Sequence, residues 1–390
     1  MTTLLVLIYI AFISLGIPDA LLGAAWPAMH ADIGVPVSLA GIISIVIAGG
    51  TVLSSLMSAR WAARFGTGRV TAFSVMATAI ALLGFSFSNS MVLLLLFAIP
   101  LGLGAGAVDA VLNNFVALHY QAKQMNWLHS FWGIGATIGP AFMGALLSAT
   151  GNWRSGYLGM AGLQAVLVAV LFLSLPLWKR AAEKAEAEQE TPARVLSLRE
   201  TLRQPLAKPV LFAFLCYCGA ESIMGLWGAS YLVSARGIAP DTAAVWVSAF
   251  CGGITVGRFA AGLLTDKWNN QQMIRIGERC AFAGIALFFI PEPNWVLLIA
   301  FFMVGLGFAP IFPALLHQTP RTFGSEASQS MIGVQMASAY IGTTCIPPLF
   351  GLMSSKWGFE LLPIVLAMLV LLMTLCTAYV REKTQEVSSK

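Results

Sequence analysis

The chain has 390 residues, of which 58% are hydrophobic and only 10% carry a charged side chain. Soluble domains are nearer one quarter charged, so this composition excludes a soluble globular protein and indicates a polytopic membrane protein. The apolar runs last about twenty residues or more, which is the length a helix needs to cross ~30 Å of hydrocarbon. The net charge of +5 comes from basic residues in short segments between these runs, and it gives no support to nucleic-acid binding.

Hydropathy predicts an all-α membrane protein with twelve transmembrane helices. The first begins without the basic segment or cleavage site of a signal peptide, so we expect it to be retained. One long polar break divides the helices six and six, which predicts bundles at 1–178 and 209–390 and a cytoplasmic linker at 179–208. The expected helices cover 3–29, 37–62, 69–89, 91–120, 126–149, 154–178, 209–235, 240–265, 272–291, 294–318, 327–353 and 359–380.

The basic residues predict the orientation. Of the 22 Lys and Arg residues, only Arg154, Arg236 and Lys356 fall on the side opposite the N-terminus, while Arg258 lies within a helix. The other eighteen would be cytoplasmic if the N-terminus is inside. The positive-inside rule therefore predicts both termini in the cytoplasm, with the chain in a bacterial-type inner membrane.

An internal repeat relates the two predicted bundles. A shift of 203 residues places the glycine pair at 49–50 on the glycine pair at 252–253. It also places the Gly-Leu-Gly at 102–104 on that at 305–307, and Asn114 on His317. A shift of 202 places Asp19 on Glu221. Two parallel repeats of this kind predict a substrate site at their interface, near the middle of the membrane.

The fourth predicted helix carries an unusual polar group in the sequence IPLGLGAGAVDAVLNNFVALHY, residues 99–120. A carboxyl at membrane depth costs at least ~2.5 kcal/mol, so Asp109 calls for a reason, and transport is the usual one. Asn113 follows four residues later and shares its helical face. The alternative is that Asp109 and the asparagines only hydrogen-bond neighbouring helices.

Other polar and aromatic residues are candidates for the same cavity. A low-dielectric surrounding disfavours the charged form of a carboxyl, so Asp19, Asp109 and Glu221 could load and release a proton on alternate sides. Each candidate also has a structural interpretation: Glu221 could pair with Arg258 or Arg154, Trp26 could anchor at the membrane boundary, and the histidines could be solvated. The predicted substrate-binding set is Asp19, Trp26, Asn113, Asn114, His129, Trp132, Glu221, Trp227, His317 and Gln335.

The loop after the eighth predicted helix reads GLLTDK, residues 262–267, which resembles the loop signature of the major facilitator superfamily. The first-half counterpart at 59–66 lacks the aspartate. In that family the loop resembles a cytoplasmic latch, which implies that Asp266, Lys267 and Arg258 serve gating.

Within that superfamily the chain looks most like the fucose permease group of sugar/proton symporters. The matching segments are GIPDALLGAAWP around Asp19 and GAVDAVLNN around Asp109. The resemblance implies that the helix-four acid carries the proton and the helix-one acid contacts the substrate. Here helix four has Asp where the group often has Glu.

The prediction is proton-coupled uptake of a small sugar or polyol by a monomer in the lipid bilayer, through alternating access. Sodium stays an alternative to protons, because a carboxylate with nearby amide oxygens can bind either. The run GIGATIGPAFMG, residues 133–144, resembles a helix-five element of drug/proton antiporters, so proton-driven efflux is the second interpretation, and a membrane receptor is the third. A phosphate-binding loop, a catalytic triad and metal-ligand spacing are all missing from the sequence, so we expect neither an enzyme nor a cofactor.

Overall fold

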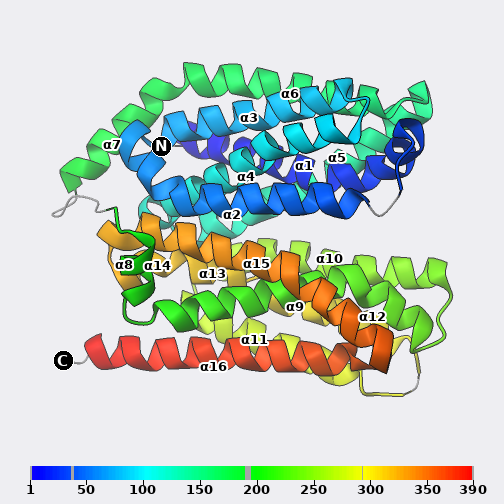
Figure 1. The fold of residues 1–390 in the computed structure, drawn as a ribbon. Helices are drawn as coiled ribbons and strands as arrows, with labels where there is room; N and C mark the ends of the chain where they lie inside the picture. The colour runs from blue at the N-terminus through cyan, green and yellow to red at the C-terminus, as the bar shows by residue number, and fades with distance from the viewer. Residues whose placement is uncertain (1, 37–38, 189–194, 292, 389–390) are drawn as a thin grey trace. The chain divides into compact units, whose positions relative to one another are not determined.

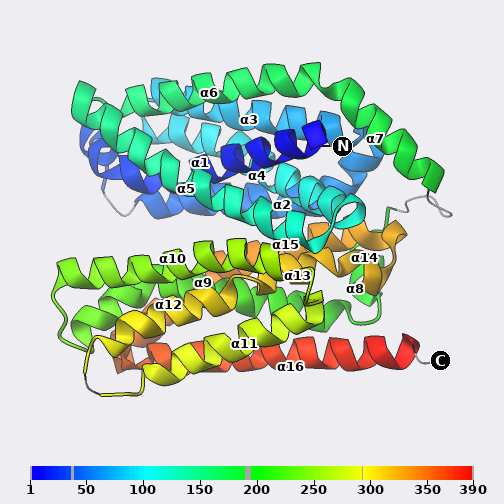
Figure 2. The same ribbon diagram turned by 180° about the vertical axis from the view of Figure 1, so that it is seen from behind.

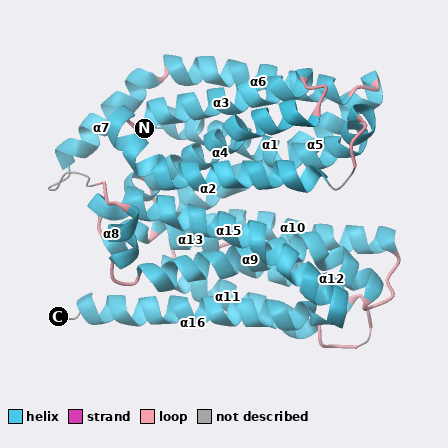
Figure 3. Cartoon of the chain, viewed as in Figure 1, coloured by secondary structure: helices cyan, strands magenta, loops and turns pink. Residues whose placement is uncertain are grey.

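A computed structural model of the chain describes residues 2–36, 39–188, 195–291 and 293–388. Helices and loops account for all of the described residues, which include no strand (Figure 3). This agrees with the prediction of an all-α membrane protein, because only helices satisfy every backbone polar group within one spanning segment.

The chain forms two compact units. The first comprises Met1–His119, Leu128–Leu198 and Ser325–Ala337, and the second comprises Tyr120–Trp127, Arg199–Gly324 and Ser338–Lys390. Two helices, α5 and α15, therefore contribute one part to each unit.

The helices of the first half of the chain are long and nearly continuous (Figure 1). Within the first unit, α4 packs against both α2 and α3, and α6 packs against α3. The bounds are α1 Thr2–Ile33, α2 Ala40–Phe65, α3 Thr67–Phe87, α4 Met91–His119, α5 Ala122–Thr150, α6 Trp153–Leu173 and α7 Leu175–Glu188.

The second half repeats this pattern with more interruptions. In the second unit α12 packs against α10 and α11, while α16 packs against α9 and runs beside α11 (Figure 2). The bounds are α8 Leu198–Arg203, α9 Ala207–Ser234, α10 Pro240–Leu264, α11 Asn270–Leu287, α12 Val296–Phe308, α13 Ile311–His317, α14 Thr319–Phe323, α15 Ser325–Trp357, the 3₁₀ turn η2 Phe359–Leu361 and α16 Leu362–Ser388.

Eleven of the described helical segments are long and apolar enough to cross a membrane. The remaining predicted span is α11, whose 18 residues include several polar ones. The tenth predicted helix differs most from expectation, because it breaks at Ala309 and Pro310 into α12 and α13. Pro310 and Pro313 each lack a backbone N–H, which removes helical hydrogen bonds at this point.

The predicted linker contains helical structure on both sides of its undescribed part, residues 189–194. The helix α7 follows α6 after a break at Ser174 and leaves the bundle at an angle (Figure 1). The short helix α8 follows directly after Ser197.

Glycine contacts between helices recur at the predicted spacing of 203 residues. In the first unit α2 and α4 cross where a side chain on Gly102 would meet the backbone of Ile47. In the second unit α10 and α12 cross where a side chain on Gly305 would meet the backbone of Phe250, and both pairs of positions differ by 203. Small residues let helix backbones approach closely in membranes, so the repeat preserves a helix crossing.

Gly253→Ala tests this crossing, because its new methyl group would meet the backbone of Phe302 and Leu306 on α12. We expect the free energy of unfolding to fall by about 1–3 kcal/mol, the usual cost of overpacking. The neighbouring Gly252→Ala is the matched control, since no described atom lies within 4 Å of the methyl group that this substitution would add. Thermal unfolding of the purified protein measures both, and equal melting temperatures for the two variants would contradict the packing role of Gly253.

Candidate functional site

The centre of the candidate site in the first unit is Asn113, which joins α4 to a neighbouring helix. Its Nδ2 donates to Asp109 Oδ1 at 2.7 Å and to the Asp109 backbone oxygen at 3.0 Å. Its Oδ1 lies 3.1 Å from Nε2 of His129 on α5. Because the amide oxygen can only accept, this contact requires a hydrogen on Nε2 of His129. Asn113 therefore connects a carboxyl and an imidazole.

Burial makes this arrangement expensive to disrupt. Asn113 is fully buried, and Asp109 and His129 are 9% and 6% exposed. Met336 Sδ on α15 lies 3.8 Å from Asn113 Nδ2, and the ring of Phe12 meets the His129 ring edge to face at 5.7 Å. A buried polar group without a hydrogen-bond partner costs about 1–3 kcal/mol, so these side chains hold one another in place.

Small residues of α4 allow its polar segment to pack tightly against α2. A side chain on Gly106 would meet the backbone of Thr51, and Ser55 Oγ donates to the Gly106 backbone oxygen at 3.1 Å. Asn114, the next residue of α4 after Asn113, accepts a hydrogen bond at its Oδ1 from Ser328 on α15 at 2.6 Å. The two adjacent asparagines thus have different partners, and it is Asn113 that reaches Asp109.

A second carboxyl approaches from α1. Trp132 Nε1 on α5 donates to Asp19 Oδ2 at 3.0 Å, so the indole fixes the position of the carboxyl. Asp19 is exposed, and the charge of Asp109 acts on it electrostatically. The predicted pair His129 and Trp132 therefore faces one way along α5, one side chain toward Asn113 and the other toward Asp19.

Two of the four glycines in the run at 133–144, Gly135 and Gly139, have a packing role against α1. Side chains on Gly135 and Gly139 would meet the backbone oxygens of Ile13 and Ile17, and one on Gly16 would meet the backbone of Trp132. This close approach of α1 and α5 brings the Trp132 indole within reach of Asp19.

The second unit contains a pair of opposite charges. Arg258 on α10 lies 3.8 Å from Glu221 on α9, and Arg258 is 5% exposed. Arg154 instead pairs with Asp32 at 2.5 Å. Of the two partners considered for Glu221, the structure brings Arg258 to it. The electrostatic influence of Glu221 and Arg258 extends to Tyr217, whose hydroxyl donates to the Phe308 backbone oxygen at 3.1 Å.

Three predicted substrate-binding residues have structural partners. Trp26 is buried in an apolar core cluster. Trp227 donates through Nε1 to the backbone oxygen of Pro347 at 2.8 Å, beside the double proline of α15. His317 contacts the Tyr120 backbone oxygen at 3.0 Å and the Asn270 amide at 2.9 Å.

The other predicted residues lie on α15 and just after the end of α10. Gln335 is fully buried on α15, whereas Asp266 and Lys267 are exposed after α10. The glycine of their loop motif, Gly262, leaves space for the indole of Trp127. Among the described residues, no group of three or more His, Cys, Asp and Glu side chains is arranged to hold a metal ion.

Sequence reasoning missed two partners of the asparagine pair, Ser328 and Met336. Both lie on α15, about 220 residues from α4, so no local spacing could indicate them. Asp32 was also missed. Its pairing with Arg154 could have been considered because both were expected at the same membrane face.

These features define a multi-pass membrane transporter: long apolar helices, a duplicated arrangement of helix crossings, and buried polar groups on spanning helices. The family model for the Major Facilitator Superfamily matches residues 8–290 and 231–390, and the chain belongs to that family.

Curated relatives are distant. An MFS-type transporter of Yersinia pestis is 23% identical over 243 residues, which is 61% of this chain and 58% of that protein. Bypass of stop codon protein 6 of Saccharomyces cerevisiae is 25% identical over 45% of this chain and 37% of its own length. The chain thus spans well under two thirds of these two relatives. A Helicobacter pylori protein, named as a candidate glucose/galactose transporter, is 24% identical over 61% of this chain and 60% of its own length.

Solved structures share the fold across nearly the whole chain. The fucose:proton symporter FucP of E. coli has a TM-score of 0.75 at 15% identity, over 96% of this chain and 98% of that one. The proton:xylose symporter XylE has a TM-score of 0.75 at 11% identity, over 97% and 94% of the two chains. The predicted twelve-helix fold of this superfamily is confirmed.

Two tryptophan substitutions distinguish a residue that acts in substrate binding from one that only stabilises helix packing. Trp132→Phe and Trp227→Phe each remove one indole N–H donor, to Asp19 and to Pro347 respectively. We expect Trp227→Phe to lower the free energy of unfolding by about 0.5–1.5 kcal/mol without changing the half-saturation concentration for transport. Trp132→Phe should raise that concentration severalfold. Transport assays and thermal unfolding of both variants measure this, and a raised half-saturation concentration for Trp227→Phe would contradict the structural role.

Proposed function

We propose that this protein takes up a small sugar or polyol together with protons, by alternating access. The observation that carries the proposal is the Asp109–Asn113–His129 chain in the first unit, next to the Asp19–Trp132 pair. It joins a buried carboxyl, suited to holding a proton, to groups that bind hydroxyls. Buried ionisable groups within membrane helices commonly mark ion and substrate pathways.

In this mechanism Asp109 is the proton carrier. When Asp109 is ionised, its Oδ1 accepts the hydrogen bond from the Asn113 amide. Protonation neutralises the carboxyl and weakens that charge-assisted bond, because bonds to ionised acceptors are the stronger ones. Protonation of Asp109 therefore loosens the position of Asn113, and with it the hydrogen bond between Asn113 and His129.

Asp19 is the substrate contact. Its carboxyl is exposed and held by the Trp132 indole, so a free carboxylate oxygen can accept from a sugar hydroxyl. The Trp132 ring also offers an apolar face on which a sugar ring can stack. Asn113 and His129 complete the proposed binding groups of the first unit. In the second unit we propose the same role for Glu221, with Arg258 balancing its charge.

The names of relatives support the sugar proposal. The Helicobacter pylori protein is named for glucose and galactose, and FucP and XylE for fucose and xylose with protons. These likenesses lie below 25% identity, so they favour a substrate class and do not select one sugar.

We further propose that residues 1–178 and 209–390 act as two moving bundles joined by the linker at 179–208. We assign both termini to the cytoplasm of a cell with the protein in its inner membrane, on the asymmetry of basic residues. The exposed Asp266 and Lys267, together with Arg258, are proposed to act in gating. Protons are preferred to sodium as the coupling ion, the protein acts as a monomer, and it catalyses no chemical reaction.

Efflux by proton antiport is the second candidate. Its support is the glycine run at 133–144, which in the structure packs α5 against α1. That packing explains Gly135 and Gly139 independently of the direction of transport. Uptake is therefore the better-supported proposal.

The direction of proton flow distinguishes these candidates. In proteoliposomes without a pH gradient, addition of a transported sugar should make the external medium more alkaline, because protons enter with the sugar. A panel of hexoses, pentoses and polyols would identify the substrate class. If no member of the panel changes the external pH, and a proton gradient drives extrusion of lipophilic cations instead, uptake is rejected in favour of efflux.

Asp19→Asn tests the substrate contact. We expect about tenfold or more weaker substrate binding, because hydrogen bonds to a charged group contribute about 1.5–3 kcal/mol. Asp32→Asn is the matched control on the same helix, since its carboxyl pairs with Arg154 and not with the Trp132 cluster. Substrate protection against thermal unfolding gives the affinities, and unchanged affinity in Asp19→Asn would contradict its assigned role.

A further inference from the structure

A polar hollow lies in the second unit, between α11, the α13–α14 region and α16. Its volume is about 330 Å³, counting the part open to solvent. Most of its lining side chains are polar, which is unusual between helices of such apolar character. The polar lining residues are Gln271, Gln318, Thr322, Thr377, Arg381 and Thr384.

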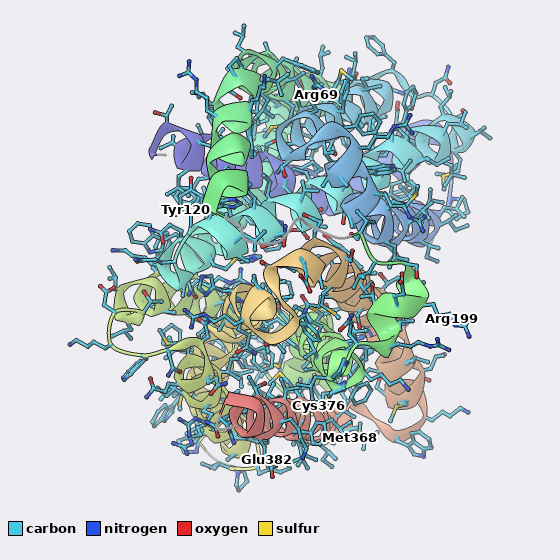
Figure 4. All side chains as sticks on the ribbon, turned by 90° about the vertical axis from the view of Figure 1, so that its left-hand side faces the viewer. Arg69, Tyr120, Arg199, Met368, Cys376 and Glu382 are labelled. Atoms are coloured by element: carbon cyan, nitrogen blue, oxygen red, sulfur yellow. The ribbon has the colours of Figure 1, made fainter. Side chains whose placement is uncertain are left out.

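The apolar part of α16 ends beside the hollow, at the level where we expect the hydrocarbon of a bilayer to end. The helix α16 has no charged residue from Leu362 to Val380, and Arg381 is the first. Nineteen residues of helix at about 1.5 Å each span roughly 28 Å, close to the thickness of the hydrocarbon core. Figure 4 looks toward the C-terminal end of α16 and labels Met368, Cys376 and Glu382 on it.

Hydrogen-bond donors with unused capacity point to an acceptor in this hollow. Within the described residues, the amides of Gln271 and Gln318 and the guanidinium of Arg381 make no hydrogen bond to another protein group. By contrast, Thr322 donates to the Gln318 backbone oxygen at 3.1 Å and Thr377 donates to Glu278 Oε1 at 2.6 Å. The lining side chains with unused hydrogen-bond donors are therefore the guanidinium of Arg381 and the amides of Gln271 and Gln318.

The charge balance around the hollow is positive. In the part of the chain that the structure describes, the carboxyl hydrogen-bonded to its lining is that of Glu278, which is 4% exposed and lies behind Thr377. Arg381 and Arg275 both act electrostatically on Glu278, so two cations face one carboxylate. Arg321 next to Thr322 and Glu382 next to Arg381 are both exposed, and their opposite charges offset each other. A bound anion is favoured over a bound cation.

We propose that this hollow binds a phosphate oxyanion, supplied by the headgroup of an anionic phospholipid. A phosphate accepts several hydrogen bonds at once and is recognised well by a guanidinium group. The leaflet on the side of the basic residues is the anionic one, and basic groups near its surface gain from that potential. Arg381 binds the phosphate oxygens directly, and the amides of Gln271 and Gln318 supply neutral donors.

Native mass spectrometry of the full-length protein in detergent tests the site. Dioleoylphosphatidylglycerol is titrated against dioleoylphosphatidylcholine, and glycerol phosphate serves as the soluble phosphate ester. We expect preferential retention of phosphatidylglycerol, and about tenfold weaker retention in Arg381→Gln, since one charge-assisted contact is lost. The matched control is Arg60→Gln, an exposed arginine at the end of α2 in the first unit, which should bind as the wild type does.

Each outcome decides the proposal. Arg381-dependent selectivity for phosphatidylglycerol supports a lipid headgroup, whereas Arg381-dependent binding of glycerol phosphate alone supports a soluble phosphate ester in the same site. Equal retention of the two lipids without binding of glycerol phosphate overturns the site, as does an equal loss in Arg60→Gln. If Arg381→Gln does not fold, Gln271→Leu removes a neutral donor and should weaken retention severalfold, and no change in that variant would overturn the proposal.

Discussion

The hydrogen bond from Asn113 to Asp109 is the interaction on which the candidate site depends. A carboxyl surrounded by apolar helices needs a polar partner, and a partner one helical turn away on the same helix is available whatever the neighbouring helices do. Asn113 then offers its oxygen to His129, which draws α5 into the same cluster. A single amide thus links an acid that can hold a proton to a helix whose next turn, through Trp132, holds the carboxyl of Asp19.

The glycine positions that pack the helices are duplicated along the chain, whereas most of the polar side chains of the candidate site are not. Glycine crossings recur at a spacing of 203 residues, because both halves need α4-like helices that pass close to their neighbours. The polar groups recur only in part: the same shift carries Asp109 to Phe312 and Asn113 to Leu316, although it carries Asn114 to His317. The carboxyl and amide at positions 109 and 113 therefore belong to the first half alone, while the second half has the Glu221–Arg258 pair, with Glu221 at the position that a shift of 202 gives to Asp19. The two halves thus share the geometry of their helix crossings, while side chains at equivalent positions differ in chemistry.

Much of this architecture follows from sequence, because the membrane restricts the available structures. Helix positions, the shared face of Asp109 and Asn113, and the glycine repeat all depend on local spacing, and the structure has them. The break at Pro310 was missed because the surrounding run is uniformly apolar. The partners of Trp227 and His317 could not be read from the sequence, since an indole or imidazole suits a substrate and a backbone oxygen equally well. Only the fold brings Trp227 to Pro347 and His317 to Tyr120.

The central claim is that Asp109 couples proton movement to substrate movement. The most direct test is to compare two transport modes of Asp109→Asn in proteoliposomes: counterflow, which exchanges labelled for unlabelled substrate without net proton movement, and accumulation driven by an imposed proton gradient. Asparagine keeps the size and polarity of the side chain and cannot carry the proton. We predict that counterflow persists while gradient-driven accumulation is lost. Accumulation at the wild-type level in this variant would contradict proton coupling through Asp109.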